Sequence, residues 1–209
     1  KTEFPSFPKI YHIGNKEIPN IFDGPVEITE KIDGSQFGFT LTNDNQLICR
    51  SKGKVIDVPD KLFKPACDHI HKLNEDGIMT KGFKFYGETL AGPHHNTLQY
   101  KKVPKNNIVL FGVFRQETAT WLAYEEISFW AGHLGVDVVP ILYQGVVDSF
   151  EQLEKLLEIE SYLGGEKIEG FVIKNYAQCS LNMYSRECFG KYVREGFKER
   201  NGAKRTADR

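Results

Sequence analysis

Short strand-like segments dominate the sequence and constrain its fold more than any other feature. They are rich in β-branched and aromatic residues and are separated by turn signals such as IDG and TNDN. Phe37, Phe39 and Leu41 alternate with small or polar residues, which predicts one buried and one open face. The predicted strands cover residues 25–31, 35–41, 46–53, 83–90, 107–114, 136–145, 168–175 and 189–196. We expect the first three strands to form an antiparallel meander.

Three segments have the apolar spacing of helices instead of strands. The predicted helices cover residues 60–77, 124–134 and 148–165. Pro65 indicates a kink or a late start of the first helix, and Gly77 ends it. The third helix has Asp148 or Ser149 as its N-cap. Because strands and helices do not alternate regularly, we predict an α+β fold with antiparallel sheets.

The composition is typical of a globular protein, with 40% hydrophobic and 26% charged residues. A length of 209 residues suits one large domain or two small ones. The formal net charge is -1, so any basic surface for nucleic acid must be local. No apolar run approaches the roughly 20 residues of a membrane helix, and the N-terminus lacks the apolar core of a signal peptide. We expect no contact with a membrane.

The cysteines indicate reduced thiols. Four of them show no CxxC spacing, and four in 209 residues do not make a disulfide framework. They are Cys49, Cys67, Cys179 and Cys188. We therefore expect a cytoplasmic, reducing compartment. The sequence does not begin with Met, which indicates processing or an incomplete chain.

Lys31 lies in the stretch TEKIDGSQF, between an acidic residue and an Ile-Asp-Gly turn. It is either an ordinary turn lysine or a nucleophile. A protonated amine is a poor nucleophile, so burial or a neighbouring cation must lower its pKa first. Gly34 permits a tight backbone that brings Asp33 and Lys31 toward one cavity. The K-x-D-G pattern fixes only three residues and is weak by itself.

Four further motifs follow in order, each within or at the end of a predicted strand. They are FYGE at 85–88, LFGVF at 110–114, EGFVIK at 169–174 and KYVR at 191–194. Together with EKIDGSQ, this set resembles the covalent nucleotidyltransferase superfamily of ATP-dependent ligases and mRNA capping enzymes. Within the superfamily the likeness is greatest to the RNA ligase 2-like family. It runs from about Phe4 to Phe197.

The resemblance implies one α+β nucleotidyltransferase (ATP-grasp-like ligase catalytic) domain over residues 1–197. Two antiparallel sheets, flanked by helices, would surround an ATP cleft. Residues 198–209 would form a basic C-terminal tail or the start of a missing C-terminal domain. The implied activity is that of a monomeric ATP-dependent RNA ligase that uses Mg²⁺ or Mn²⁺. Such an enzyme forms lysyl-AMP, transfers AMP to a 5′-phosphate end and joins that end to a 3′-OH.

The same resemblance implies roles for individual residues. Lys31 would attack the α-phosphate of ATP, and Glu169 would bind the metal or its waters. Phe114 would stack on adenine, and Val172 would close the other face of the base. A stacked base contributes about 1–3 kcal/mol and discriminates little among bases, so purine choice would come from other polar groups.

Six more residues would bind the nucleotide by resemblance. They are Glu30, Gln36, Arg50, Glu88, Lys174 and Lys191. Glu88 would bind the ribose, and Arg50 would contact the nucleotide and the 5′-phosphate of the substrate. Lys174 and Lys191 would neutralise phosphates. These cations would lower the pKa of Lys31 and the carboxylates would raise it, and the sequence does not decide which effect is larger.

Two alternatives remain open. An ATP-dependent DNA ligase, or less readily a GTP-using capping enzyme, would carry similar motifs. The other alternative is a nucleic-acid-binding module of this fold without sealing activity. The irregular KYVR motif favours that reading, because strand alternation places Arg194 on the face opposite Lys191. The excess of seven Lys or Arg over three Asp or Glu in residues 191–209 suits either phosphate contacts or a solvated end.

Overall fold

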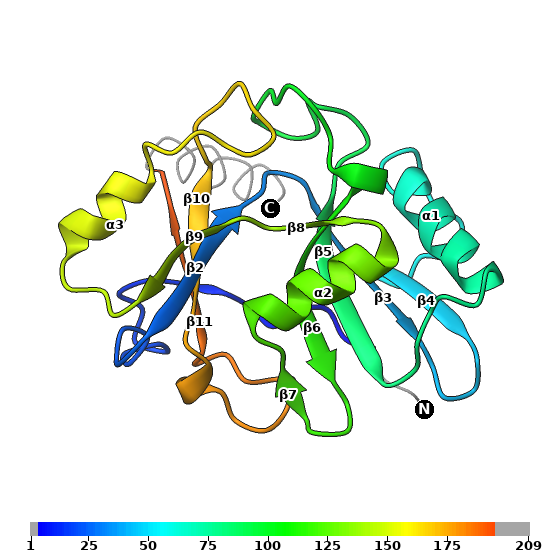
Figure 1. Cartoon of the computed structure of the whole chain (residues 1–209), viewed down its shortest axis with the longest axis horizontal. Coiled ribbons are helices and arrows are strands. Elements are labelled where there is room, and N and C mark those ends of the chain that lie inside the picture. Colours follow the sequence, from blue (N-terminus) through cyan, green and yellow to red (C-terminus); the bar gives the residue numbers. More distant parts are fainter. Residues whose placement is uncertain (1–3, 195–209) are drawn as a thin grey trace, which may run out of the picture.

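The computed structural model describes residues 4–194 of the chain. The predicted tail at 198–209, the domain limit at 197 and the end of the strand predicted at 189–196 lie outside these residues. Two sheets stand side by side in Figure 1, with helices on their outer faces. Most strand pairs are antiparallel, and the mixture of strands and helices confirms the α+β fold.

The first sheet has five strands in the order β1-β11-β10-β2-β9. Their bounds are β1 Tyr11–His12, β2 Val26–Lys31, β9 Ile141–Gly145, β10 Gly170–Lys174 and β11 Phe189–Val193. The central pairs are antiparallel, whereas β1 pairs with β11 in parallel. This sheet therefore gathers strands from both ends of the described chain around β2 and β10.

The second sheet has six strands, with β4-β3-β5-β6-β7 in order and β8 paired to β6 in parallel. Their bounds are β3 Ser35–Leu41, β4 Leu47–Ser51, β5 Phe83–Thr89, β6 Ile108–Arg115, β7 Thr120–Trp121 and β8 Asp137–Val138. Two short 3₁₀ helices, Lys105–Asn107 and Tyr176–Gln178, lie in loops. The second sheet supplies the wall opposite β2 and β10.

The predicted meander is wrong at its first turn. β2 does not pair with β3 but with β10 and β9, while β3 pairs with β4 and β5. The chain leaves one sheet at Lys31 and enters the other at Ser35. The Ile-Asp-Gly turn signal is correct as a change of direction, but a turn signal does not specify a partner strand. Residues 32–34 are a crossover between the two sheets.

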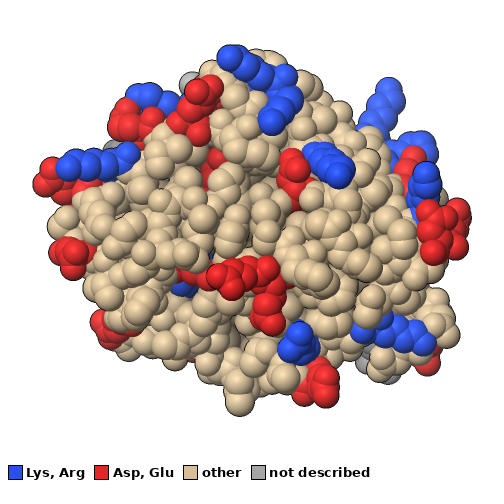
Figure 2. Space-filling model, viewed as in Figure 1, with Lys and Arg blue, Asp and Glu red and all other residues tan. Residues whose placement is uncertain are grey.

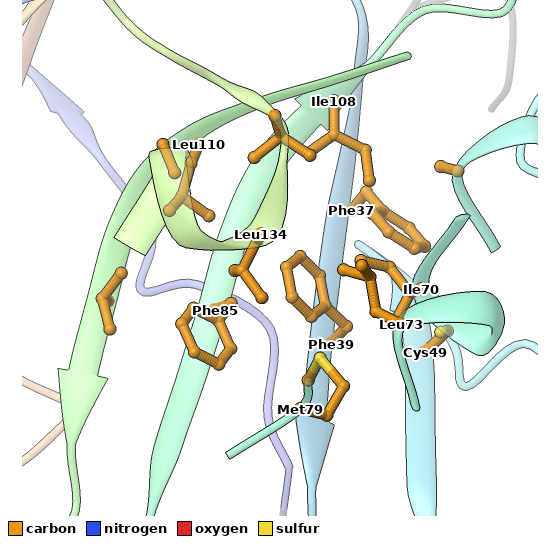
Figure 3. Close-up of a cluster of buried hydrophobic side chains, with 14 of the residues drawn as sticks. Phe37, Phe39, Cys49, Ile70, Leu73, Met79, Phe85, Ile108, Leu110 and Leu134 are labelled. Atoms are coloured by element: carbon orange, nitrogen blue, oxygen red, sulfur yellow. The ribbon is translucent and has the colours of Figure 1, made fainter. Parts of the chain in front are cut away.

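Two helices cover the outer face of the second sheet. α1 (Lys64–Glu75) and α2 (Tyr124–Leu134) pack their apolar residues on Phe37, Phe39 and Phe85 (Figure 3). The rings of Phe39 and Phe85 stack with centroids 5.0 Å apart. This core confirms the predicted buried face of the strand at 35–41, and it leaves the opposite face of the sheet to the interior between the sheets.

The first and third helices begin as the sequence predicts, but the third helix is shorter than predicted. α1 begins at Lys64 with Pro65 in its first turn, so the late start is confirmed. α3 (Phe150–Leu156) begins at Ser149, whose hydroxyl accepts a hydrogen bond from the backbone of Gln152 at 3.3 Å. It ends well before residue 165, so the longer helix was wrong. Tertiary contacts hold the chain beyond α3 against β2, and the helical spacing of apolar residues in the sequence does not reveal such contacts.

The thiol prediction is wrong for one pair of cysteines. Cys179 and Cys188 form a disulfide, whereas Cys49 and Cys67 are free and buried. The connection between β10 and β11 folds back on itself, and this brings together two cysteines that are nine positions apart. A missing CxxC pattern therefore did not exclude a bond.

Charged side chains of both signs are interspersed over the face that carries α2 (Figure 2). No single sign covers this face, as expected for a chain with a formal net charge of -1. No helix within residues 4–194 has the length and apolar character needed to cross a membrane.

Gly170 is the glycine most tightly enclosed by the sheet. A Cβ at this position would lie 2.2 Å from the carbonyl oxygen of Tyr192 and 2.8 Å from the Cα of Val193. Both atoms belong to the backbone of β11 and cannot rotate away. Gly170→Ala is therefore expected to lower the free energy of unfolding by about 1–3 kcal/mol, measured by urea unfolding.

Gly132 in α2 gives a matched control for this substitution. A Cβ there would have no atom within 4 Å. Gly132→Ala is expected to stabilise the protein by roughly 0.5–1 kcal/mol, because alanine is the better helix residue. Equal effects of the two substitutions would show that the enclosure of Gly170 has no energetic consequence.

Candidate active site

A cavity of about 320 Å³ lies between the two sheets. The first sheet contributes residues of β2, β10 and β11, and the second sheet contributes residues of β3, β5 and β6. Eight predicted site residues line it: Glu30, Lys31, Gln36, Glu88, Glu169, Val172, Lys174 and Lys191. Two predicted residues, Arg50 and Phe114, do not belong to this lining.

Lys31 ends β2 and reaches across to the residue that precedes β10. Its Nζ donates a hydrogen bond to Oε1 of Glu169 at 2.8 Å. The Lys31 side chain is 29% exposed and that of Glu169 only 2%, so the pair lies at the cavity wall with the amine on the open side. Gly170 pairs directly with Lys31 across β2 and β10, which explains this proximity.

The charged side chains around Lys31 set the direction of its pKa shift. Burial is the largest single effect and lowers the pKa of Lys31. The attraction of Glu169, Glu88 and Asp33 opposes it, and the sum raises the pKa above its ordinary value. The amine is therefore a protonated ammonium near neutral pH. Additional positive charge among these carboxylates is needed before it can lose a proton.

The two carboxyl groups beside Lys31 bind protons more tightly than usual. Burial raises the pKa of Glu88 to about 8 and that of Glu169 to about 7, against the attraction of the Lys31 ammonium. A cation bound beside either carboxylate would offset the cost of burying its negative charge, so that the group could release its proton. Glu88 and Glu169 therefore favour the binding of a cation between the sheets.

Glu169 is the residue best suited to a divalent cation. Its Oε2 is buried and has no hydrogen-bond partner among the described residues. Within residues 4–194 no group of three or more His, Cys, Asp or Glu side chains gathers to hold a metal. Mg²⁺ typically uses one or two carboxylates together with waters and substrate phosphates. The side chains present therefore fit an ion that arrives with a nucleotide, not one held by a protein cage.

The acidic neighbours of Lys31 in the motif have structural partners. Glu30 accepts hydrogen bonds from Oγ of Ser161 at 2.6 Å and from the backbone of Tyr162 at 3.1 Å. These bonds hold the chain beyond α3, and they explain why that helix stops early. Glu30 thus lines the cavity with its carboxylate already engaged.

Asp33 holds a loop on the other side of the crossover. Its Oδ2 accepts from the backbone amides of Thr97 and Leu98 at 2.7 and 2.6 Å. Its own amide donates to the hydroxyl of Tyr100 at 3.0 Å. Together with Glu30, Asp33 fixes the backbone on both sides of Lys31.

The position of Gly34 leaves no room for a side chain. A Cβ on Gly34 would lie 2.7 Å from the carbonyl oxygen of Thr89 and 3.2 Å from Oε2 of Glu88. The crossover can approach β5 this closely only without a side chain. The last residue of the K-x-D-G pattern therefore lets the segment that carries Lys31 lie close to Glu88.

Of the two phenylalanines in the LFGVF motif, Phe111 lines the cavity and Phe114 does not. Phe111 belongs to β6 of the second sheet, and Val172, which also lines the cavity, belongs to β10 of the first. Phe111 is the extra residue of a β-bulge, because Tyr86 pairs with Gly112 and Gly87 with Leu110.

The bulge shifts the alternation of β6 by one residue, which puts Phe114 on the same face of the sheet as Phe111. Phe114 lies farther along the strand, 5% exposed, with the ring of Trp121 5.2 Å away. Of these two rings, Phe111 lines the cavity and Phe114 does not, so Phe111 is the candidate for base stacking.

Arg50 is bound to backbone carbonyls outside the cavity lining. Its guanidinium donates to the backbone carbonyls of Phe4 at 2.7 Å, Ser51 at 2.9 Å and Lys52 at 3.2 Å. Arg50 does not line the cavity, whereas Lys52 does. Pairing with Gly38 places Arg50 toward the N-terminal segment instead of the nucleotide space.

The remaining predicted residues lie where the motifs placed them. Val172, Lys174 and Lys191 line the cavity, and Val172 pairs with Lys191 across β10 and β11. The Lys174 amine donates to the carbonyl of Phe111. Arg194, whose role the sequence left open, donates to the carbonyls of Ile168 and Leu157. Arg194 therefore supports the loop before Glu169.

Comparison with known proteins agrees with this geometry. A model of the RNA ligase family matches residues 24–193, most of the chain. The chain belongs to the RNA ligase family. No curated protein matches the chain.

Solved structures of the Naegleria gruberi RNA ligase have the same fold as this family member. The form with PPi has a TM-score of 0.70 at 18% identity, over 97% of this chain and 60% of that chain. A substituted form with ATP and Mn has a TM-score of 0.68 at 18% identity, over 96% and 59%. The present chain thus spans about three fifths of the length of the Naegleria chains.

The sequence did not assign several residues that line the cavity of this RNA ligase family member. Among them are Phe111, Lys52 and residues 7–10. The bulge that exposes Phe111 leaves no sequence signal, because Phe111 and Phe114 occur in the same motif. Residues 7–10 had a signal in the repeated Phe-Pro of FPSFP, which predicts extended backbone before each proline.

Lys174 makes the stability of the domain depend on pH. Burial lowers its pKa to about 8 from 10.5, although Glu27 opposes the shift. Between these values the unfolded chain keeps a proton that the folded chain has released, so stability rises with pH across this window. Below about pH 8 the buried charge costs up to about 3 kcal/mol.

Lys174→Met is expected to stabilise the protein most at neutral pH, with an advantage over wild type that shrinks toward pH 10.5. Urea unfolding of both proteins across this range measures the difference. Lys64→Met removes an exposed lysine of α1, 63% exposed, and should show no such trend. The same pH trend in both variants would contradict a special role of Lys174.

Proposed function

We propose that this chain is the adenylyltransferase part of an ATP-dependent RNA ligase. The observation that carries the proposal is the Lys31–Glu169 pair in a cavity that is also lined by Phe111 from one sheet and Val172 from the other. An amine at a cavity wall, an aromatic ring for a base and buried cations for phosphates together suit nucleotidyl transfer. Family membership supports ligation of RNA.

In the first step Nζ of Lys31 would attack the α-phosphorus of ATP. The N–P bond forms, the bond from the α-phosphorus to the bridging oxygen of the leaving group breaks, and pyrophosphate departs. One proton of the ammonium passes to solvent before attack, and a second leaves the nitrogen for the departing pyrophosphate or solvent as the N–P bond forms. Lys174 and Lys191 would offset the negative charge that develops on the phosphate oxygens.

Glu169 would hold Mg²⁺ or Mn²⁺ through Oε2, and the bound ion would supply the positive charge that lowers the pKa of Lys31. Glu88, at the same wall, would accept a hydrogen bond from a ribose hydroxyl. AMP would then pass to the 5′-phosphate of an RNA end, and a 3′-OH would displace it.

The test is covalent labelling of the protein by α-labelled ATP in the presence of Mg²⁺ or Mn²⁺. We expect an adduct of one AMP that is stable to denaturation and is released by acid. Labelling with GTP alone would instead indicate a capping enzyme. Absence of label with both nucleotides would favour a nucleic-acid-binding module without the chemistry.

A second measurement concerns the nucleic acid. Labelled protein is offered nicked duplexes that differ only in RNA or DNA on the 3′-OH side, since the 2′-OH is the local difference. Sealing of the RNA nick is expected. Equal or preferred sealing of the DNA nick would assign the chain to DNA ligation.

A further inference from the structure

Residues 4–10, here called the N-terminal strap, form one wall of the cavity. Phe7, Pro8, Lys9 and Ile10 all line it. The strap begins against the second sheet and continues into β1, which pairs with β11 of the first sheet (dark blue in Figure 1). It therefore bridges the two sheets beside the proposed nucleotide site.

One row of paired residues across the second sheet forms the surface on which the strap packs. Arg50, Gly38, Tyr86 and Gly112 are paired in one row across β4, β3, β5 and β6. A Cβ on Gly38 would lie 3.1 Å from Cζ of Phe4. The two glycines leave room for aromatic rings, and the two large side chains stand beside them.

The second glycine of the row, Gly112, leaves room for the ring of Phe7. A Cβ on Gly112 would lie 2.9 Å from Cε2 of Phe7. The Phe7 ring is 4% exposed and meets the rings of Tyr86, Trp121 and Phe189. Such burial holds the middle of the strap on the sheet.

Three side chains bind successive backbone groups of the strap. Arg50 Nη1 donates to the carbonyl of Phe4 at 2.7 Å, and the Tyr86 hydroxyl donates to the carbonyl of Pro5 at 2.6 Å. Oε1 of Gln36 accepts from the amide of Phe7 at 3.3 Å. Gln36 and Arg50, which resemblance assigned to the nucleotide, are thus engaged with the protein's own backbone.

The strap also supports the ring that faces the base. Phe7 packs edge-on against Phe111, with centroids 5.0 Å apart and planes at 79°. Phe111 belongs to a bulge, where ladder hydrogen bonds are interrupted, so side-chain packing has more influence on its position. Displacement of Phe7 would free the Phe111 ring.

We propose that the N-terminal strap positions Phe111 and closes the nucleotide cavity, and that Arg50 is a positioning residue that acts through this strap. The inference rests on the proposed function for its nucleotide readout. If Arg50 acts only through the strap, its removal has no further effect once the strap is gone. A direct contact with nucleotide would still be lost in that background.

The experiment is a double-mutant cycle with Arg50→Ala, a deletion of residues 1–6, and both together. Deletion removes the carbonyls that Arg50 and Tyr86 bind. The readout is the ATP concentration for half-maximal labelling, with the maximal labelling rate measured separately. We expect a rise of about tenfold for Arg50→Ala, the loss typical of a hydrogen bond from a charged donor. The deletion should give a similar rise, and the double variant no more.

If the ATP concentration for half-maximal labelling rose about a hundredfold in the double variant, as the product of two independent tenfold effects, the proposal would be overturned. Arg115→Ala removes an arginine that pairs with Glu126 outside the cavity and should leave the ATP concentration unchanged. Arg50→Lys keeps a donor for the Phe4 carbonyl and should recover most of the affinity. If the deletion does not fold, Tyr86→Phe replaces it, because it removes only the hydroxyl bond to Pro5.

Trypsin supplies a readout that does not require nucleotide chemistry. Lys9 is exposed, and cleavage after it needs a loosened strap. We expect Arg50→Ala to speed this cleavage about tenfold, and ATP to slow it in wild type. An unchanged rate in Arg50→Ala would overturn the anchoring role. Wild type that takes no label would refute the proposed function, while the cleavage rate would still test the strap.

Discussion

Lys31→Ala is expected to abolish covalent labelling by α-labelled ATP. Lys31 is the lysine that the structure pairs with buried Glu169 at 2.8 Å, and its amine is the atom proposed to form the bond to phosphorus. Removal of a nucleophile leaves no covalent intermediate, so the loss should be complete. Denaturing gel electrophoresis of wild type and variant in parallel measures it.

The matched control is Lys31→Arg, which keeps a cation beside Glu169 but has no amine that can lose a proton near neutral pH. It should fold like wild type and also take no label. Lys31→Ala leaves Glu169 buried without its partner, so its unfolding should be recorded as well. Persistent label on another cavity lysine, such as Lys52 or Lys191, would contradict the assignment of Lys31.

Phe111→Ala is expected to raise the ATP concentration for half-maximal labelling by roughly 5- to 150-fold. Stacking of a base on an aromatic ring contributes about 1–3 kcal/mol, and Phe111 is the ring of the LFGVF motif that lines the cavity. The maximal labelling rate should change less than the affinity, because the phosphate groups keep their cations. Labelling at several ATP concentrations separates the two quantities.

Phe114→Ala is the matched control in the same motif. Phe114 is 5% exposed and packs on Trp121, so its truncation should destabilise the protein by about 3–5 kcal/mol. ATP affinity of the folded fraction should remain near that of wild type. If Phe114→Ala lost affinity for ATP while Phe111→Ala did not, the assignment of base stacking to Phe111 would be wrong.

Much of the site followed from the order of short motifs. Lys31, Glu88, Glu169, Val172, Lys174 and Lys191 were assigned from sequence and all line one cavity. Each lies in or beside a strand, where alternation and turn signals constrain the direction of a side chain. Their chemical roles stay predictions until labelling is measured.

The errors concern features that depend on distant parts of the chain. The first meander was wrong because β2 finds its partner in β10, about 140 residues later. Arg50 lies outside the cavity lining because its guanidinium binds the carbonyl of Phe4, a contact that no local sequence pattern predicts. The helix after Ser149 ended early because Glu30 holds Ser161 and Tyr162.

The sequence alone determined the local elements: an α+β chain of short strands, a glycine after the nucleophile motif and a set of cations and carboxylates in a definite order. These follow from interactions between near neighbours, which set periodicity and turns. Only the tertiary structure decided that residues 32–34 cross between the sheets, that Phe111 and not Phe114 lines the cavity, and that nearby carboxylates raise the pKa of Lys31. Those outcomes depend on strand partners, a bulge and the sum of charges in a buried cavity, all of which exist only once the chain has folded.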